Sequence, residues 1–386
     1  MMDNTVKQLL ALVKAALTGV GPEPVSGVDW QRLCKLAAFH NITGLIAAEA
    51  EKLEDVPQAV RDELNRAQAF NIYREANQEL TVQKLLEDFE KAGIDHMPLK
   101  GFIIKHMYPS PELREMCDVD ILVRCDQLDA INKVMVDNGF VFQTESAHEY
   151  IYNIGMVNIE LHKSLVPNYN HDLYAYYGDG WKFAHKVEGY AHMYEMIPED
   201  FYVYGIAHAA KHYLNGGLGI RQVADIYVMR HSMPLQCDYI DNQLKSLGLE
   251  KFDQIICDLC EMWFSDSLGD ADVYQMEVYI LNSGTFGTSD MANKSRLYRA
   301  SQGMTYRGAK LNSVKKAIFP AKEQIKKAYP NIGKMPYPIA IICRWAYLLT
   351  KERGRVSVKI SADTVSDDEI DIFAKHCEKM GLRKTL

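Results

Sequence analysis

The sequence predicts an α+β fold in which a small mixed β-sheet is flanked by helical regions. Apolar residues recur at three- and four-residue spacing over the first 92 residues, as in helices that bury one face. Between residues 93 and 196, short extended apolar runs alternate with short helical patterns, and after residue 197 the helical spacing returns. We therefore expect an N-terminal helical region (1–92), a sheet-containing core (93–196) and a C-terminal helical region (197–386).

The N-terminal and core elements can be placed in order from their patterns. A long amphipathic helix is expected over 57–92, and Gly93 then stops it. Alternation and turn residues divide the core into short elements. These are an extended segment at 95–99, a helix at 102–107, a strand at 117–123, a helix at 126–139 and extended segments at 140–146, 148–155 and 156–165.

Helical patterns follow at 198–216, 219–232 and 237–248 and continue to the C-terminus. The segment NSGTFGTSDMANKSR (282–296) contains two glycines and reads as one flexible connection. It lacks the glycine spacing of a dinucleotide-binding or Walker phosphate loop. No phosphate-binding function is therefore assigned to it.

The composition is that of an ordinary globular protein. The 386 residues are 48% hydrophobic, which is enough for two or three packed units. The formal net charge is −8 and the basic residues form no run of five or more, so we expect no duplex nucleic acid as a partner. No stretch approaches the ~18 apolar residues of a membrane span, and eight scattered cysteines favour reduced thiols. We expect a cytoplasmic protein without membrane association, and the oligomeric state stays open.

Two aspartates stand in an otherwise apolar strand, CDVDILV. Residues i and i+2 of a strand share a face, so Asp118 and Asp120 project side by side with Cα atoms about 6.5 Å apart. Val119 faces the opposite way, into the apolar layer. Adjacent carboxylates repel unless a cation lies between them, and Mg²⁺ is commonly held by one or two carboxylates plus substrate phosphates. The alternative is a solvated edge strand whose carboxylates simply face water.

A third carboxylate comes from the later segment MVNIELH. Glu160 lies on a strand that could pair beside the aspartate strand, with His162 on the same face. Three carboxylates from two neighbouring strands fit a two-metal phosphoryl or nucleotidyl transfer. A Glu that alternates with apolar residues is also ordinary on a half-exposed strand. His162 could equally be a strand histidine that is hydrogen-bonded to its neighbours.

The residues around the aspartate strand offer contacts for phosphate. Lys100 and Gly101 close one strand and open the next helix, so a helix N-terminus and a residue without a side chain lie beside a cation. Arg114 precedes Asp118 by four residues and can make a bidentate phosphate contact. These three residues form the expected nucleotide-binding set.

The helical region after residue 197 carries polar residues that could cover the cleft. We expect a polar wall, for which a buried Arg–Asp structural network is the alternative. Zinc is not expected, because the segment HAAKH lacks the Glu of H-E-x-x-H and Cys257 and Cys260 have no second ligand pair. Together with His162, the residues of this substrate cleft are His208, Lys211, His212, Arg221 and Asp225.

The motif series PLKG, YPSPELREMCDVDILV and NIELH resembles the nucleotidyltransferases of the DNA polymerase β-like superfamily. It is most similar to a bacterial family of uncharacterised nucleotidyltransferases, with a specific likeness over 98–123 and 157–163 and a similar layout over roughly 30–350. The wider superfamily usually has a Gly-Ser pair at the strand-to-helix turn, where this chain has Lys100-Gly101. The hydroxyl contact to phosphate is therefore missing.

The resemblance implies a small mixed-sheet nucleotidyltransferase core with named roles. Asp118, Asp120 and Glu160 would be catalytic and hold Mg²⁺ or Mn²⁺, while Lys100, Gly101 and Arg114 would hold phosphate. The implied reaction moves an NMP from an NTP to a hydroxyl of a small-molecule or protein acceptor that the sequence does not identify. The alternative is a non-catalytic nucleotide-binding or regulatory module on the same fold.

Overall fold

The computed structural model describes residues 3–350 and 365–383. Contacts between residues divide the described chain into two compact units. The first unit comprises 3–213, 217–287 and 380–383, and the second comprises 214–216 and the described part of 288–379. This grouping follows packing, whereas the three regions expected from the sequence follow the kind of secondary structure. The three-region division therefore stays a prediction.

The first unit contains a five-stranded mixed sheet, as the sequence predicts. The strand order is β1-β2-β5-β4-β3, in which β2 pairs parallel to β5 and the other neighbours pair antiparallel. The aspartate strand is therefore internal, between β1 and β5, and the alternative of a solvated edge strand is wrong. The strands are β1 His96–Pro98, β2 Asp118–Val123, β3 Val141–Glu145, β4 Glu149–Ile154 and β5 Val157–His162.

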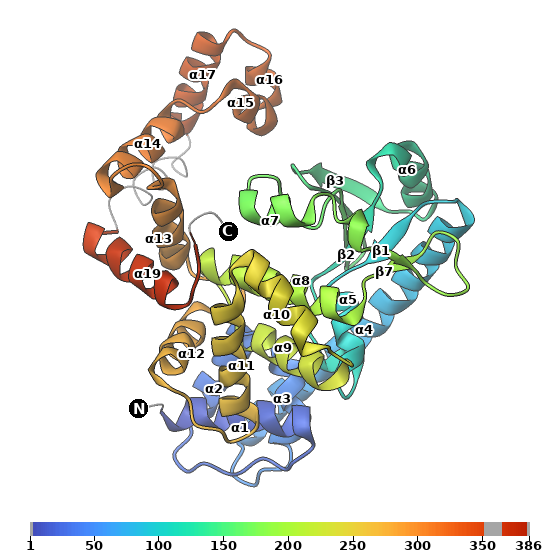
Figure 1. Ribbon diagram of the computed structural model, residues 1–386, viewed down its shortest axis with the longest axis vertical. Helices are drawn as coiled ribbons and strands as arrows, with labels where there is room; N and C mark the ends of the chain where they lie inside the picture. Colours follow the sequence, from blue (N-terminus) through green and yellow to red (C-terminus); the bar gives the residue numbers. More distant parts are fainter. Residues whose placement is uncertain (1–2, 351–364, 384–386) are drawn as a thin grey trace. The chain divides into compact units, whose positions relative to one another are not determined.

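One face of this sheet forms the hydrophobic core with two helices. Helix α4 (Gln58–Lys91) contributes Phe89, and α6 (Leu128–Asp137) contributes Met135, to a cluster that includes Val119 and other inward residues of β2 and β5. Figure 1 shows α4 and α6 beside the sheet. Because strand side chains alternate, burial of Val119 on this face leaves Asp118 and Asp120 on the other.

The remaining helices of the first unit precede and follow the sheet. Asp3 caps the first helix by accepting a hydrogen bond from the Val6 amide, which satisfies one of its free N–H groups. The expected helix at 102–107 is observed as one α-helical turn followed by a 3₁₀ turn at Lys105–Met107. The helices are α1 Asn4–Thr18, α2 Trp30–Phe39, α3 Thr43–Ala50, α5 Gly101–Ile104, α7 His171–Tyr177, α8 Pro198–Leu214, α9 Ile220–Ser232, α10 Cys237–Leu247, α11 Glu250–Phe264 and α12 Ala271–Ser283.

Glycines allow the α12 end to approach the α8–α9 turn. A Cβ on Gly217 would lie 2.2 Å from the Gly287 nitrogen, and one on Gly219 would lie 2.6 Å from Thr285 Oγ1. The expectation of a single loop over 282–296 is wrong, because α12 ends at Ser283 and the next helix begins at Ser289. Within the intervening residues, Gly284 and Thr285 are buried, whereas Phe286 is exposed.

The described part of the second unit consists of helices and the turns between them, without a strand. Rings of Tyr298 and Phe373 meet edge to face, and a small apolar cluster contains Ile325 and Ile341. No helix in the described ranges of either unit is both long and apolar enough to cross a membrane. Its helices are α13 Ser289–Ala300, α14 Tyr306–Ile318, α15 Lys322–Ala328, α16 Pro330–Gly333, α17 Tyr337–Thr350 and α19 Asp367–Lys379.

A buried ion pair joins the loop before β2 to helix α9. Arg114 donates from Nε to Asp225 Oδ1 (2.7 Å) and from Nη2 to Oδ2 (2.8 Å), and the Tyr108 hydroxyl also donates to Oδ1 (2.8 Å). The two charged side chains are only 7% and 8% exposed. Arg221 adds a second link by donating from Nη1 to the Glu115 carbonyl at 2.6 Å.

Replacing Asp225 with Ala should lower the free energy of unfolding by about 3 to 5 kcal/mol, because Arg114 is left as an unpaired buried charge. Denaturant unfolding followed by circular dichroism measures this loss. Asp241→Ala is the matched control on the neighbouring helix α10, where the side chain is exposed, and it should change stability by less than about 0.5 kcal/mol.

The double variant Arg114→Met, Asp225→Leu should recover most of the lost stability, since no buried charge then lacks its partner. Equal stabilities for Asp225→Ala and Asp241→Ala would show that the ion pair does not support the fold.

Candidate active site

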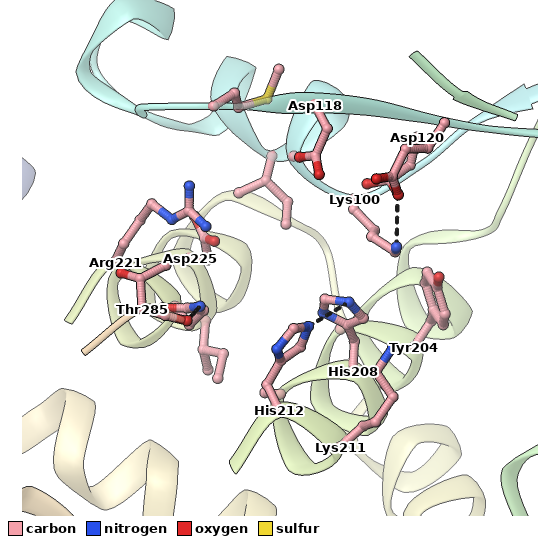
Figure 2. Close-up of a pocket in the computed structure, with 18 of the residues that line it drawn as sticks. Lys100, Asp118, Asp120, Tyr204, His208, Lys211, His212, Arg221, Asp225 and Thr285 are labelled. Atoms are coloured by element: carbon pink, nitrogen blue, oxygen red, sulfur yellow. Dashed lines mark hydrogen bonds and ion pairs between the residues drawn. The ribbon is translucent and has the colours of Figure 1, made fainter. Parts of the chain in front are cut away.

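A cavity of about 290 Å³ lies over the sheet face that carries the aspartates. Strands β2 and β5 form one wall, and helices α8 and α9 provide the facing wall (Figure 2). Every predicted site residue lines it. Those residues are Lys100, Gly101, Arg114, Asp118, Asp120, Glu160, His162, His208, Lys211, His212, Arg221 and Asp225.

The parallel pairing of β2 with β5 sets the positions of the carboxylates. Asp120 stands opposite Glu160, and Asp118 stands opposite Asn158. One ligand atom each from Asp120, Glu160 and His162 lies within 4.8 Å of the others, a spacing that could hold a metal ion. Asp118 is on the same face but outside this group, and its side chain is exposed.

Two hydrogen-bond donors, Lys100 and His162, keep Asp120 ionised. Lys100 Nζ lies 2.9 Å and His162 Nε2 2.6 Å from the same oxygen, Oδ1. Burial opposes ionisation, but Lys100 and His162 outweigh it and hold the pKa of Asp120 well below its usual range. No hydrogen bond to Oδ2 is seen from the described residues, and this oxygen is left for another ligand.

Asp118 has the opposite electrostatic setting. The surrounding protein desolvates its carboxylate, and repulsion from Asp120 and Glu160 adds to this, which raises the pKa of Asp118 to about 6. Its accessible surface is open to the cavity, so solvent or a ligand can still reach it. A cation placed beside it would favour the ionised form.

Lys100 reaches the cavity from a strained backbone conformation. Its φ is +48°, an uncommon value for a residue with a side chain. Leu99 continues the ladder by donating its amide to the Asp120 carbonyl, and the chain then turns into α5. The strain persists because the Lys100–Asp120 pair and the start of the helix both fix this residue.

Packing against Arg114 leaves no room for a side chain at position 101, which explains the glycine there. A Cβ at position 101 would lie 2.4 Å from Arg114 Nη1 and 2.9 Å from Met116 Sδ. The other two guanidinium nitrogens of Arg114 are bonded to Asp225. Asp225 of the expected polar wall is thus in a buried Arg–Asp pair, but its partner is Arg114 and not the Arg221 of that wall. A phosphate contact from Arg114 stays a prediction.

Two other cations on the facing wall lack such a partner. Lys211 of α8 has no ion pair or hydrogen bond with the described residues, and burial together with Lys100 lowers its pKa to about 8. Arg221 Nε is buried without a hydrogen-bond partner in the same set of residues. A buried donor without a partner is costly, so these groups are suited to an anionic ligand.

His208 and His212 form a neutral pair beside Lys211. Their Nε2 atoms lie 3.1 Å apart, so one ring donates its proton to the other. Burial lowers the pKa of His212 to about 3 and that of His208 well below its usual value. Two neutral rings can satisfy this contact, whereas two imidazolium ions would repel each other.

The cavity also contains residues that the sequence interpretation missed. His148 and Glu149 lie where β4 begins, and Glu149 stands opposite His162 in the antiparallel register. Thr285 and Phe286 enter from the segment after α12. The sequence signal for the first two was their place in the extended segment predicted at 148–155, whose pairing with the Glu160 strand was not predicted. The glycines around Thr285 suggested only flexibility.

Residues 26–265 match a family described as uncharacterised nucleotidyltransferase. No curated protein is significantly similar in sequence. Among solved structures, the antibiotic-resistance factor ANT(2'')-Ia is similar over 45% of this chain and 91% of its own, with 9% identity and a TM-score of 0.35. The family match includes all the cavity residues except Thr285 and Phe286 and covers more than half of the sequence, so the chain belongs to the family of uncharacterised nucleotidyltransferases.

Proposed function

We propose that this protein is a metal-dependent, polymerase β-like nucleotidyltransferase that moves an NMP from an NTP to a hydroxyl of an acceptor. The main support is the parallel β2–β5 register, which sets Asp120 beside Glu160 with Asp118 on the same face of the cavity. The acceptor oxygen bonds to the α-phosphorus, the bond to the β-phosphate oxygen breaks, and pyrophosphate leaves. The hydroxyl proton passes to a base of the site.

The oxygen donors fit Mg²⁺ or Mn²⁺. Asp120 offers Oδ2, because Lys100 and His162 use Oδ1, and the carboxylates of Asp118 and Glu160 face the same space. A bound metal would neutralise phosphate charge and align the reacting groups. His162 and Lys100 act as positioning residues that keep Asp120 ionised and oriented.

Lys211 and Arg221 are proposed to bind the triphosphate, together with Lys100. Arg221 brings a buried Nε donor without a partner, and Lys211 brings a desolvated ammonium. Phosphate oxygens would satisfy both and form charge-assisted hydrogen bonds. Gly101 and Arg114 remain part of the proposed nucleotide site, but the contacts of Arg114 with Asp225 limit it to Nη1, which lies against Gly101.

The second candidate is a non-catalytic module that binds a nucleotide or regulates a partner. The Lys100–Asp120 pair favours this reading, since it neutralises Asp120 without any metal. Only the first candidate predicts that the protein converts NTP into product and pyrophosphate. The family name and the cavity are common to both.

Purified protein incubated with each labelled NTP and Mg²⁺ or Mn²⁺ should release pyrophosphate or label itself or an added acceptor. Asp118→Asn should lower the rate and the metal–NTP affinity by about tenfold or more, since even outer-shell changes at metal sites cost 10- to 100-fold. Asp126→Asn, an exposed aspartate outside the cavity, is the control and should match wild type. Nucleotide binding without turnover for any acceptor class would favour the module.

Glu160→Gln should reduce kcat by about 10²-fold while changing NTP affinity little, because alignment or deprotonation of the hydroxyl matters mainly in the transition state. Single-turnover rates and equilibrium NTP binding separate the two effects. Glu145→Gln, an exposed carboxylate on β3, serves as the control. A Glu160→Gln enzyme as fast as wild type removes Glu160 from the catalytic set.

NTP affinity should fall by about tenfold between pH 7 and pH 9, because Lys211 loses its charge as the pH rises through a pKa of about 8. Burial and the nearby Lys100 ammonium lower the pKa of Lys211. The surrounding carboxylates raise it only in part; they are Asp120, Glu149 and Glu160. Phosphate binding favours the charged form, so the loss occurs on the alkaline side.

In Lys211→Arg the guanidinium stays charged over this range, so the affinity should be nearly independent of pH. Equilibrium binding of Mg²⁺–NTP at several pH values measures both proteins. The same pH profile in wild type and Lys211→Arg would show that the ammonium does not contact the nucleotide.

A further inference from the structure

Three side chains that line the cavity form a second cluster of metal-ligand type. One atom each from His148, Glu149 and His162 lies within 4.8 Å of the others. Glu149 is directly opposite His162 across the β4–β5 pair, and His148 precedes it in the chain. His148 Nε2 is 3.1 Å from Glu149 Oε2, and the rings of His148 and His162 have centroids 5.6 Å apart. Two imidazoles and one carboxylate therefore converge.

An independent observation marks this cluster as incomplete. His162 is 2% exposed, and its Nδ1 is buried without a hydrogen-bond partner among the described residues. Its Nε2 lies 2.6 Å from Asp120 Oδ1, and a contact that short to a carboxylate requires the proton on Nε2. Burial opposes the charged ring, but Asp120 and Glu160 outweigh it and raise the pKa of His162. Above that pKa the ring is neutral, and Nδ1 then carries a lone pair and no hydrogen. A buried acceptor left in this state needs an explanation, and a bound cation supplies one.

We propose that His148, Glu149 and His162 bind a divalent transition metal, for which Zn²⁺ is the representative ion. Imidazole nitrogen suits Zn²⁺, Fe²⁺, Co²⁺ and related ions, whereas Mg²⁺ prefers oxygen donors. Two histidines and one carboxylate are a known ligand set for Zn²⁺ with an open position for water or substrate. The site is thus chemically distinct from the carboxylate oxygens of Asp118, Asp120 and Glu160.

Asp120 has a defined part in this arrangement. A histidine that binds a metal through one nitrogen usually donates its other N–H to a carboxylate, which fixes the ring and its tautomer. The His162–Asp120 contact is such a bond, with the free Nδ1 on the opposite side of the ring. Asp120 would orient His162 for the transition metal through Oδ1, while Oδ2 remains available elsewhere.

The local charge can accommodate a dication. Lys100 is already paired with Asp120, and the carboxylates of Glu149 and Glu160 both attract Lys211. A metal bound by Glu149 would compete with Lys211 for that carboxylate. Because this ammonium has no hydrogen-bonded partner to lose among the described residues, it can move toward solvent or an anion.

Two other groups in the cavity are the competing locations for the same ion. Asp120, Glu160 and His162 form a metal-sized group that shares His162. His208 and His212 lie four residues apart on α8, but their Nε2 atoms already bond to each other. Neither competitor uses His148 or Glu149. Substitutions at those two residues therefore identify the proposed site.

The test uses the 386-residue chain freed of metal, without nucleotide, so its result does not depend on the proposed function. Zn²⁺ affinity is measured by competition with a chromophoric chelator, and Co²⁺ is added separately to read ligand geometry from its visible absorption. Wild type should bind one Zn²⁺ with the highest affinity. His148→Ala, His148→Gln and Glu149→Gln should each weaken this binding by about tenfold or more, since removing even an outer-shell partner costs 10- to 100-fold.

The matched controls are Glu160→Gln and His212→Gln, each of which removes a member of one competing group. The Zn²⁺ affinity of both variants should stay within threefold of that of wild type. Circular dichroism of each variant confirms that it is folded. Loss of affinity in either control with His148→Gln unaffected would place the ion in that competing group and overturn the proposal. Failure of folded wild type to bind Zn²⁺ or to change the Co²⁺ spectrum would overturn it as well.

Discussion

The buried Arg114–Asp225 pair is the interaction on which the geometry of the cavity depends. It joins two residues 111 positions apart and fixes the loop before β2 against α9. That loop leads directly into Asp118, and α9 carries Arg221 on the facing wall. Because two parallel hydrogen bonds join the guanidinium to the carboxylate, neither side chain can rotate or shift without breaking one of them. This pair, together with the Arg221–Glu115 hydrogen bond, therefore fixes the loop that leads into Asp118 against α9. Gly101 must lack a side chain because the Arg114 guanidinium lies against it.

The two aspartates of β2 differ in ionisation because their neighbours differ. Asp120 contacts Lys100 and His162, so its charge is compensated within the protein. At Asp118, burial and repulsion from Asp120 and Glu160 outweigh the attraction of the nearby cations and raise the pKa to about 6. An identical spacing on the strand thus produces one ionised and anchored carboxylate and one whose charge responds to what enters the cavity. This asymmetry depends on Lys100, which reaches Asp120 from a backbone with positive φ.

The sequence predicted those parts of the fold and site that local periodicity determines. Alternation in CDVDILV gave the face shared by Asp118 and Asp120, and it also gave the inward direction of Val119. It could not reveal that Arg114 is bonded to Asp225, because that partner is set by how α9 packs. His148 and Glu149 were missed for a related reason, since only the β4–β5 register brings Glu149 opposite His162.

The two oxygens of Asp120 divide the cavity into two kinds of coordination chemistry. Oδ1 is committed to Lys100 and to the imidazole of His162, a residue that also belongs to the cluster with His148 and Glu149. Oδ2 has no hydrogen bond with the described residues, and Glu160 and Asp118, which line the same cavity, offer only oxygen. Because hard cations prefer oxygen and transition metals prefer imidazole, the two sides select different ions. One internal carboxylate can thus support both without being shared as a bridging ligand, provided that His162 keeps its proton on Nε2.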